Sequence, residues 1–114
     1  MNDDWYAEDW YGQMMYQYTL KHAIEDGELI EIFKNRWAEL TGGKPLVATK
    51  HICAEFSMAS LQEIWNEFAR WKREVEPNLA EEDRLFSTTM NGDIEKVWVI
   101  EEPHAFTILF PEDY

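Results

Sequence analysis

The sequence SLQEIWNEFARWKREVEP, residues 60–77, carries the clearest structural pattern of the chain. Ser60 and Glu63 match a capping box, in which a serine caps the first helical turn and a glutamate three residues later reaches back to it. The apolar side chains that follow share one helical face: Leu61, Ile64, Trp65, Phe68, Trp71 and Val75. Charged side chains occupy the outer face: Glu67, Arg70, Lys72, Arg73 and Glu74. Pro77 ends the pattern, so we predict an amphipathic helix over residues 60–75.

A pattern of strands follows this helix toward the C-terminus. Three segments are rich in β-branched and aromatic residues and are separated by turn residues: residues 85–90, 93–100 and 105–110. Asn91-Gly92 favours a two-residue type I′ hairpin turn, which would place Leu85 opposite Trp98. We therefore predict a meander of three antiparallel strands.

Shorter elements precede the helix. Three short helices are predicted there: Thr19 to Asp26 with Gly27 as its stop, Phe33 to Leu40 ended by Gly42-Gly43, and a third capped by Thr49. Two extended runs are also predicted: residues 29–32 and 46–48. Together these elements predict an α+β fold, with several N-terminal and central helices packed on a three-stranded antiparallel β-meander at the C-terminus. We expect one compact domain over residues 19–114, preceded by an acidic-aromatic arm over residues 1–18.

The charge of the chain is strongly negative. Among 114 residues, 23 Asp and Glu outnumber 10 Lys and Arg, for a net charge of −13. The excess lies at the two ends, because residues 1–18 carry a net −4 and residues 76–114 a net −8. Such a chain would repel phosphates, which argues against direct binding to nucleic acid or to an anionic membrane.

The sequence also suggests a cellular compartment. Cys53 is the only cysteine, which excludes an internal disulfide and fits a reducing environment. No apolar run approaches the ~20 residues of a membrane span, and the first residues do not resemble a signal peptide. We expect a cytoplasmic protein.

No catalytic or metal-binding motif is present in the sequence. The candidate nucleophiles and soft metal ligands are His22, His51, His104 and Cys53, and they show no paired ligand spacing. We interpret Cys53 as a small core residue and not as a reactive thiol. We expect no enzyme activity, no catalytic residue, no metal and no cofactor, and a small enzyme remains the weakest of our hypotheses.

The N-terminal arm repeats Asp-Trp-Tyr at Asp4–Tyr6 and Asp9–Tyr11. One interpretation is an arm whose aromatic side chains pack on the domain while its acids face water. The other is an acidic-aromatic segment that docks on a partner, because Tyr and Trp are frequent at interface hot spots.

Three stretches of this chain resemble a family of small uncharacterised proteins from bacterial plasmids, phages and other mobile elements: Ala23–Ile32, Pro45–Thr49 and Thr107–Asp113. The likeness runs over residues 16–113, and the matching pieces are mostly structural. It carries over no activity and no site residues. It implies a mobile-element context, in which small acidic inhibitors of host defence systems are common.

These observations lead to a functional hypothesis. Carboxylates on a rigid scaffold can imitate a nucleic-acid backbone and attract a basic cleft. We therefore expect a non-enzymatic inhibitor, anti-CRISPR or anti-restriction, that occupies a basic surface of a nucleic-acid-binding host complex. The partner-binding residues would be acids with two tryptophan anchors: Asp3, Asp4, Trp5, Glu8, Asp9, Trp10, Glu81, Glu82, Asp83, Asp93, Glu95, Glu101 and Glu102. The alternatives are acidity that serves solubility alone, and an accessory interaction domain of a plasmid or phage that binds without mimicry through its helix face.

Overall fold

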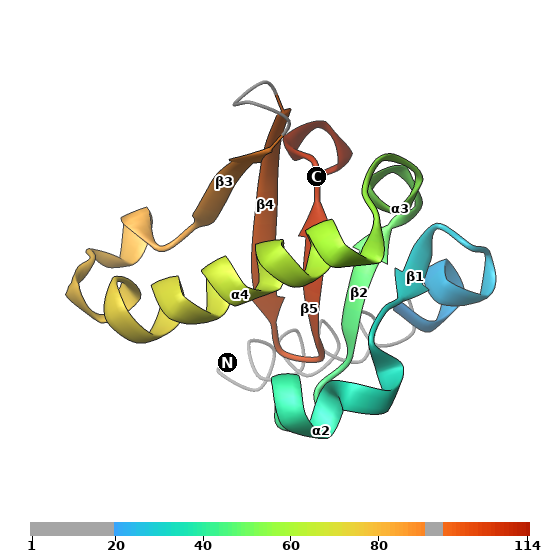
Figure 1. Cartoon of the computed structure of the whole chain (residues 1–114), viewed down its shortest axis with the longest axis horizontal. Coiled ribbons are helices and arrows are strands. Elements are labelled where there is room, and N and C mark those ends of the chain that lie inside the picture. The colour runs from blue at the N-terminus through green and yellow to red at the C-terminus, as the bar shows by residue number, and fades with distance from the viewer. Residues whose placement is uncertain (1–19, 91–94) are drawn as a thin grey trace, which may run out of the picture.

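The computed structural model describes residues 20–90 and 95–114 (Figure 1). Residues 20–25 are helical, and three further helices follow in this part of the chain: α2 Trp37–Leu40, α3 Lys50–Glu55 and α4 Met58–Glu74. The strands are β1 Leu29–Glu31, β2 Leu46–Thr49, β3 Phe86–Met90, β4 Glu95–Glu102 and β5 Ala105–Leu109. Short 3₁₀ turns complete the described elements: η1 Lys34–Arg36, η2 Glu76–Asn78, η3 Glu81–Asp83 and η4 Pro111–Asp113.

The described strands form one five-stranded mixed sheet in the order β1-β2-β5-β4-β3. Our prediction of a three-stranded antiparallel meander is therefore wrong. The three C-terminal strands do pair in an antiparallel manner, but β5 also pairs with β2 in parallel, and β1 extends the sheet beyond β2. As a result β5 lies at the centre of the sheet, and all five of its residues are buried.

The missing strand pairs have a physical reason. The extended runs were predicted at nearly the right residues, but a strand of three or four residues carries too little pattern to reveal its partner. The pair Val47 and Thr107 joins positions sixty residues apart. Such a parallel pair requires a long connection, which here contains α3, α4, β3 and β4, and no local pattern in the sequence predicts the pair.

The β3–β4 hairpin has a different register from the predicted one. Trp98 lies opposite Ser87 rather than Leu85, and Met90 lies opposite Glu95. The predicted register, in which Met90 would lie opposite Asp93, is therefore wrong. The turn at Asn91-Gly92 itself lies outside the described residues. A shift of two residues leaves every side chain on its original face, so alternation of apolar residues cannot detect it.

Helix α4 lies across one face of the sheet and supplies much of the core (Figure 1). The helix starts earlier than predicted, because the side chain of Ser57, not Ser60, accepts the capping hydrogen bond, from the backbone N–H of Ser60 at 3.2 Å. Four of the six apolar side chains that the helical spacing predicts are buried: Leu61, Ile64, Trp65 and Phe68. Trp71 is half-buried, and the prediction is wrong for Val75, which follows the end of the helix and is exposed. The sheet contributes buried side chains to the same core: Leu46, Ala48, Phe86, Val97, Val99, Phe106 and Ile108.

The segment before β2 differs from the predicted single helix. It forms η1 and then the four-residue α2, preceded by Phe33 in the left-handed region at φ 52°. The indole N–H of Trp37 donates a hydrogen bond to the carbonyl of Ile32 at 2.9 Å, which ties α2 to the end of β1. Gly42 and Gly43 adopt positive φ and end the helix, as predicted. The predicted cap of α3 is confirmed, because the Thr49 hydroxyl accepts a hydrogen bond from the backbone N–H of Ile52.

Within residues 20–90 and 95–114, no helix combines the length and the apolar character that a membrane crossing requires.

Candidate interaction surfaces

The structure describes only part of the predicted acidic interface. Seven of the predicted residues lie outside the described residues: Asp3, Asp4, Trp5, Glu8, Asp9, Trp10 and Asp93. Glu95 begins β4, but its side chain is also outside the description. The predicted residues whose side chains can be placed are Glu81, Glu82, Asp83, Glu101 and Glu102.

Glu81, Glu82 and Asp83 form the turn η3, which follows α4 and η2 and precedes β3. All three are exposed, and no ion pair between described residues includes any of them. The neighbouring Arg84 takes part in none of the ion pairs between described residues; its Nε–H donates to the backbone carbonyl of Leu79 at 3.1 Å. We call Glu81, Glu82 and Asp83 the acidic turn.

Glu101 is in a different situation, because its carboxylate is paired inside the molecule. It contacts the ammonium groups of Lys44, at 3.1 Å, and of Lys72. Burial alone would raise the pKa of Glu101, but the hydrogen bonds and charges of Lys72 and Lys44 outweigh burial and lower it. The hydrogen bond to Glu101 likewise raises the pKa of Lys72, against the opposing effect of burial. Glu101 therefore joins α4 to β4 and contributes little negative charge to an outside partner.

Glu102, the next residue, is half-buried and takes part in none of the described ion pairs. Arg84, beside the acidic turn, and Glu101 line the same cavity of about 180 Å³. The residue after the acidic turn thus lies near Glu101, although none of the three acids of the turn lines this cavity.

The histidines and the cysteine do not form a site in the part of the chain that is described. No group of three or more His, Cys, Asp or Glu side chains among those residues could hold a metal ion. His51 contacts the carboxylate of Asp113 at 3.2 Å and lies against the ring of Phe110. Cys53 packs against the core, and burial raises the pKa of its thiol. A raised pKa lowers the thiolate fraction, which makes the thiol less nucleophilic.

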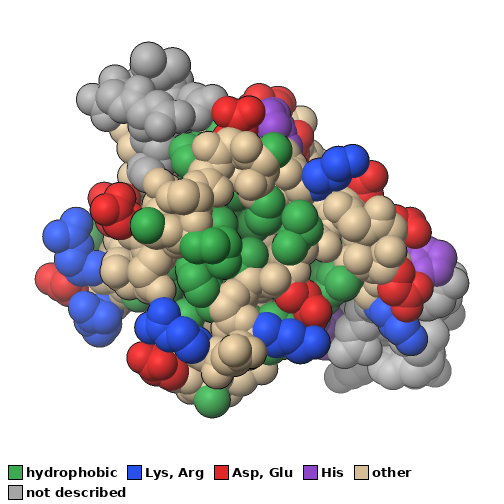
Figure 2. Space-filling view, turned by 45° about the vertical axis from the view of Figure 1, so that its right-hand side comes forward, with side chains coloured by type: hydrophobic (Ala, Val, Ile, Leu, Met, Phe, Trp, Pro, Cys, Tyr) green, Lys and Arg blue, Asp and Glu red, His purple; other side chains and the backbone are tan. Residues whose placement is uncertain are grey.

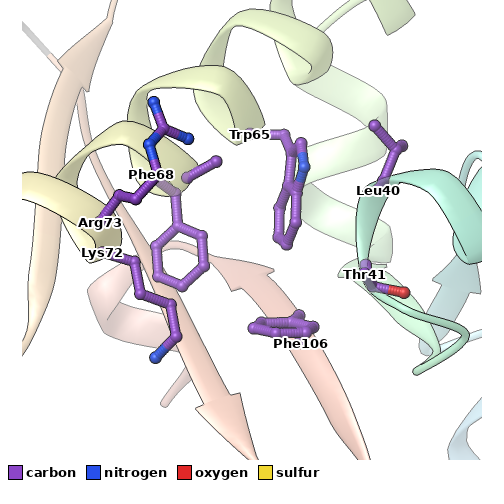
Figure 3. A pocket seen from close by; sticks show the side chains of 8 residues that line it. Leu40, Thr41, Trp65, Phe68, Lys72, Arg73 and Phe106 are labelled. Atoms are coloured by element: carbon purple, nitrogen blue, oxygen red, sulfur yellow. The ribbon is translucent and has the colours of Figure 1, made fainter.

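A second candidate surface is a groove between α4, α2 and β5, with a volume of about 340 Å³ (Figure 3). We call it the aromatic groove; its lining residues are Leu40, Thr41, Trp65, Phe68, Ala69, Lys72, Arg73 and Phe106. Figure 3 shows Leu40 and Thr41 on one side, Lys72 and Arg73 on the other, and the rings of Trp65, Phe68 and Phe106 between them.

The aromatic floor of this groove is held in a fixed arrangement. The rings of Trp65 and Phe106 meet edge to face with centroids 5.1 Å apart, and those of Phe68 and Phe106 do so at 5.7 Å. This is the geometry that the ring quadrupoles prefer. Trp65, Phe68 and Phe106 also pack against the rest of the core, so the floor is preformed.

The rim of the groove is basic although the chain is acidic. Lys72 and Arg73 are the charged residues among those that line it, and Lys44 lies over the ring of Phe106 with its ammonium 4.7 Å from the centroid. Lys44 is paired with Glu101, and Lys72 is paired with both Glu101 and Glu76. The Arg73 side chain is 71% exposed, and its ion pair with the adjacent Glu74, at 3.7 Å, is the longest in the described residues. Arg73 is thus available to an incoming carboxylate.

The sequence contains a signal for this groove that our interpretation missed. We assigned Lys72 to the solvated face, but it follows Trp65 by seven positions and Phe68 by four, so it lies on their side of the helix. Ala69 lies on the same side and is too small to fill the space beside Phe68. A lysine and an alanine within an aromatic stripe indicate a hollow with a basic edge.

Hydrophobic and charged side chains lie close together on the surface of the molecule. Figure 2 shows hydrophobic side chains gathered near the middle of one face, bordered by basic and acidic side chains.

In comparisons with protein-family models, curated proteins and solved structures, no significant match to this chain was found.

Proposed function

We propose that this protein is a non-enzymatic inhibitor from a mobile element, which binds a basic, nucleic-acid-binding surface of a host defence complex. The observation that carries the proposal is the acidic turn: three consecutive exposed carboxylates that form no ion pair with any described residue, on a chain of net charge −13. Unpaired carboxylates keep their full charge for a partner. Such charge steers association with a basic cleft and occupies the positions of phosphates.

The structure narrows the set of residues that we assign to this interface. Glu81, Glu82 and Asp83 stay in it, together with Glu102. We remove Glu101 from it, because Lys44 and Lys72 already neutralise its charge. Asp3, Asp4, Trp5, Glu8, Asp9, Trp10, Asp93 and Glu95 remain predictions from the sequence.

The test compares two triple charge reversals. Glu81→Lys, Glu82→Lys and Asp83→Lys change the acidic turn; the matched control is Glu25→Lys, Asp26→Lys and Glu28→Lys, which makes the same charge change at exposed positions near β1, on the opposite side of the molecule (Figure 1). Partners are captured from a bacterial lysate with the wild-type protein and identified by mass spectrometry. Association rates with the recovered partner are then measured for all three proteins.

If the acidic turn mimics phosphates, these measurements should give the following results. The reversal at the acidic turn should slow association more than it speeds dissociation, and the control should act much less. Binding should weaken steeply with salt, because surface charges farther apart than ~8 Å are screened near physiological ionic strength. DNA or RNA of the partner should compete. A partner that binds nucleic acid and this protein at once, with affinity independent of salt, would refute mimicry.

The aromatic groove favours a second candidate function, an accessory interaction domain that binds without mimicry. Tryptophan and arginine are enriched at interface hot spots, and the groove places the exposed Arg73 on the same surface as Trp65. In that case affinity would depend on the groove and not on the acidic turn, and both charge reversals would leave it nearly unchanged.

A further inference from the structure

The aromatic groove has the properties of a binding site and not of a packing defect. Its floor consists of three aromatic side chains that are at most 7% exposed as residues: Trp65, Phe68 and Phe106. A volume of about 340 Å³ lies at the lower end of the range for ligand sites, about 300–1,000 Å³. It suits an inserted side chain better than a whole cofactor.

The charges around the groove define the chemistry of its occupant. The charged residues that line it, Lys72 and Arg73, are both basic, although acids outnumber bases by more than two to one in the chain. Glu101 already engages Lys72, which leaves Arg73 as the cation with the weakest internal pairing. A guanidinium at the edge of an aromatic hollow binds a carboxylate through two parallel hydrogen bonds, with more geometric specificity than an ammonium. The occupant should therefore combine an aromatic side chain with a nearby carboxylate.

We propose that the aromatic groove binds an acidic peptide segment of a partner protein, with an aromatic side chain inserted against Trp65 and Phe106 and a neighbouring carboxylate paired with Arg73. Leu40 and Thr41 form the opposite wall, so the peptide runs between α2 and α4 (Figure 3). This site is independent of the acidic turn and goes beyond the proposed inhibitor function, because it recognises an acidic partner and not a basic one.

The experiment is a selection of random nine-residue peptides displayed on phage, using the full-length protein as bait. Counter-selection uses Ala69→Leu, which fills the hollow beside Phe68 while keeping a good helix former in α4. Enriched peptides should share an aromatic residue with Asp or Glu within a few positions. Loss of enrichment for any such motif, or enrichment of basic peptides, would overturn the proposal.

The consensus peptide is then synthesised with a fluorescent label and titrated by anisotropy. Arg73→Glu should weaken its binding about tenfold or more, which corresponds to roughly 1.4 kcal/mol. The matched control is Arg70→Glu, which makes the same charge change on α4 at an exposed residue outside the groove, and it should change binding less than about twofold. Equal effects of the two variants would show a general charge attraction and refute the site. Circular dichroism of each variant verifies that α4 is intact, and Arg73→Glu, at an exposed position, decides the matter even where Ala69→Leu lowers stability.

Two further outcomes would assign the groove to another occupant. If the peptide binds only after Trp5→Ala and Trp10→Ala, the acidic-aromatic segment of this chain competes for the groove, and the partner proposal fails. If sedimentation shows a dimer that Ala69→Leu dissociates, a second copy occupies the groove. Binding to a monomer with intact Trp5 and Trp10 supports the proposal.

Discussion

Removal of the Phe68 ring should destabilise this protein strongly. Phe68 is 2% exposed and contacts four rings, with centroid distances of 5.2 Å to Trp65, 5.5 Å to Phe86, 5.7 Å to Phe106 and 6.0 Å to Trp71. A core Phe→Ala substitution costs about 3–5 kcal/mol. Because Phe68 also borders the aromatic groove, part of the space left by the ring would open to solvent and would not remain an enclosed void. We therefore expect Phe68→Ala to cost about 3 kcal/mol, at the lower end of that range.

Urea unfolding followed by circular dichroism at 222 nm measures this cost without depending on tryptophan fluorescence, which the substitution itself would alter. A loss of about 3 kcal/mol is a large part of the ~5–15 kcal/mol that stabilises a typical domain. Arg70→Ala, an exposed substitution two residues farther along α4, serves as the control and should change stability by no more than about 0.5 kcal/mol. A loss below about 1 kcal/mol for Phe68→Ala, with an unchanged denaturant slope, would refute the packing of α4 on the sheet.

Two other predictions concern the N-terminal cap of α4 and the ion pair that joins α4 to β4. Ser57→Ala removes the side-chain acceptor of the helix cap and should cost about 0.5–2 kcal/mol, whereas Ser60→Ala should cost less than about 0.5 kcal/mol; the reverse order in urea unfolding would restore the capping box as the true start. The melting temperature of the wild-type protein should fall at acid pH and at alkaline pH, and Glu101→Gln should make both falls smaller. Because the pKa of Glu101 is lowered in the folded protein, Glu101 contributes to stability. This contribution is full above the ordinary glutamate pKa of about 4.3 and is lost as pH falls through the folded-state pKa. Because the pKa of Lys72 is raised in the folded protein, Lys72 contributes to stability as well. This contribution is full below the ordinary lysine pKa of about 10.4 and is lost as pH rises through the folded-state pKa. A constant difference between variant and wild type from acid to alkaline pH would contradict this account.

Local signals predicted much of the secondary structure and little of its assembly. The apolar face of α4 from Leu61 to Phe68, the Thr49 cap and the glycine stop after α2 follow from side chains within one or two turns of each other, and they are confirmed. The parallel pair of β2 and β5 depends on residues sixty positions apart, for which a single sequence holds no signal. The hairpin register failed because a slip of two residues preserves the alternation of faces.

The same distinction applies to the candidate site. Exposure of the acidic turn could be predicted, because Asp and Glu are almost never buried without a partner and three consecutive acids are costly to bury together. Neutralisation of Glu101 could not, because its partners Lys44 and Lys72 lie 57 and 29 positions away in the sequence. The groove needs α2 beside α4, an arrangement that depends on the tertiary fold.

The central position of β5 has a consequence for the order in which this protein can fold during synthesis. β5 follows the four other described strands in the chain, so the pairs β1–β2 and β3–β4 lack their common neighbour until β5 has left the ribosome. Until then both flanking strands, β2 and β4, present an unpaired edge, which is a template for association with other chains. The closing step joins distant segments and is intrinsically slow. The nascent chain is therefore most vulnerable to aggregation and proteolysis just before its centre is inserted.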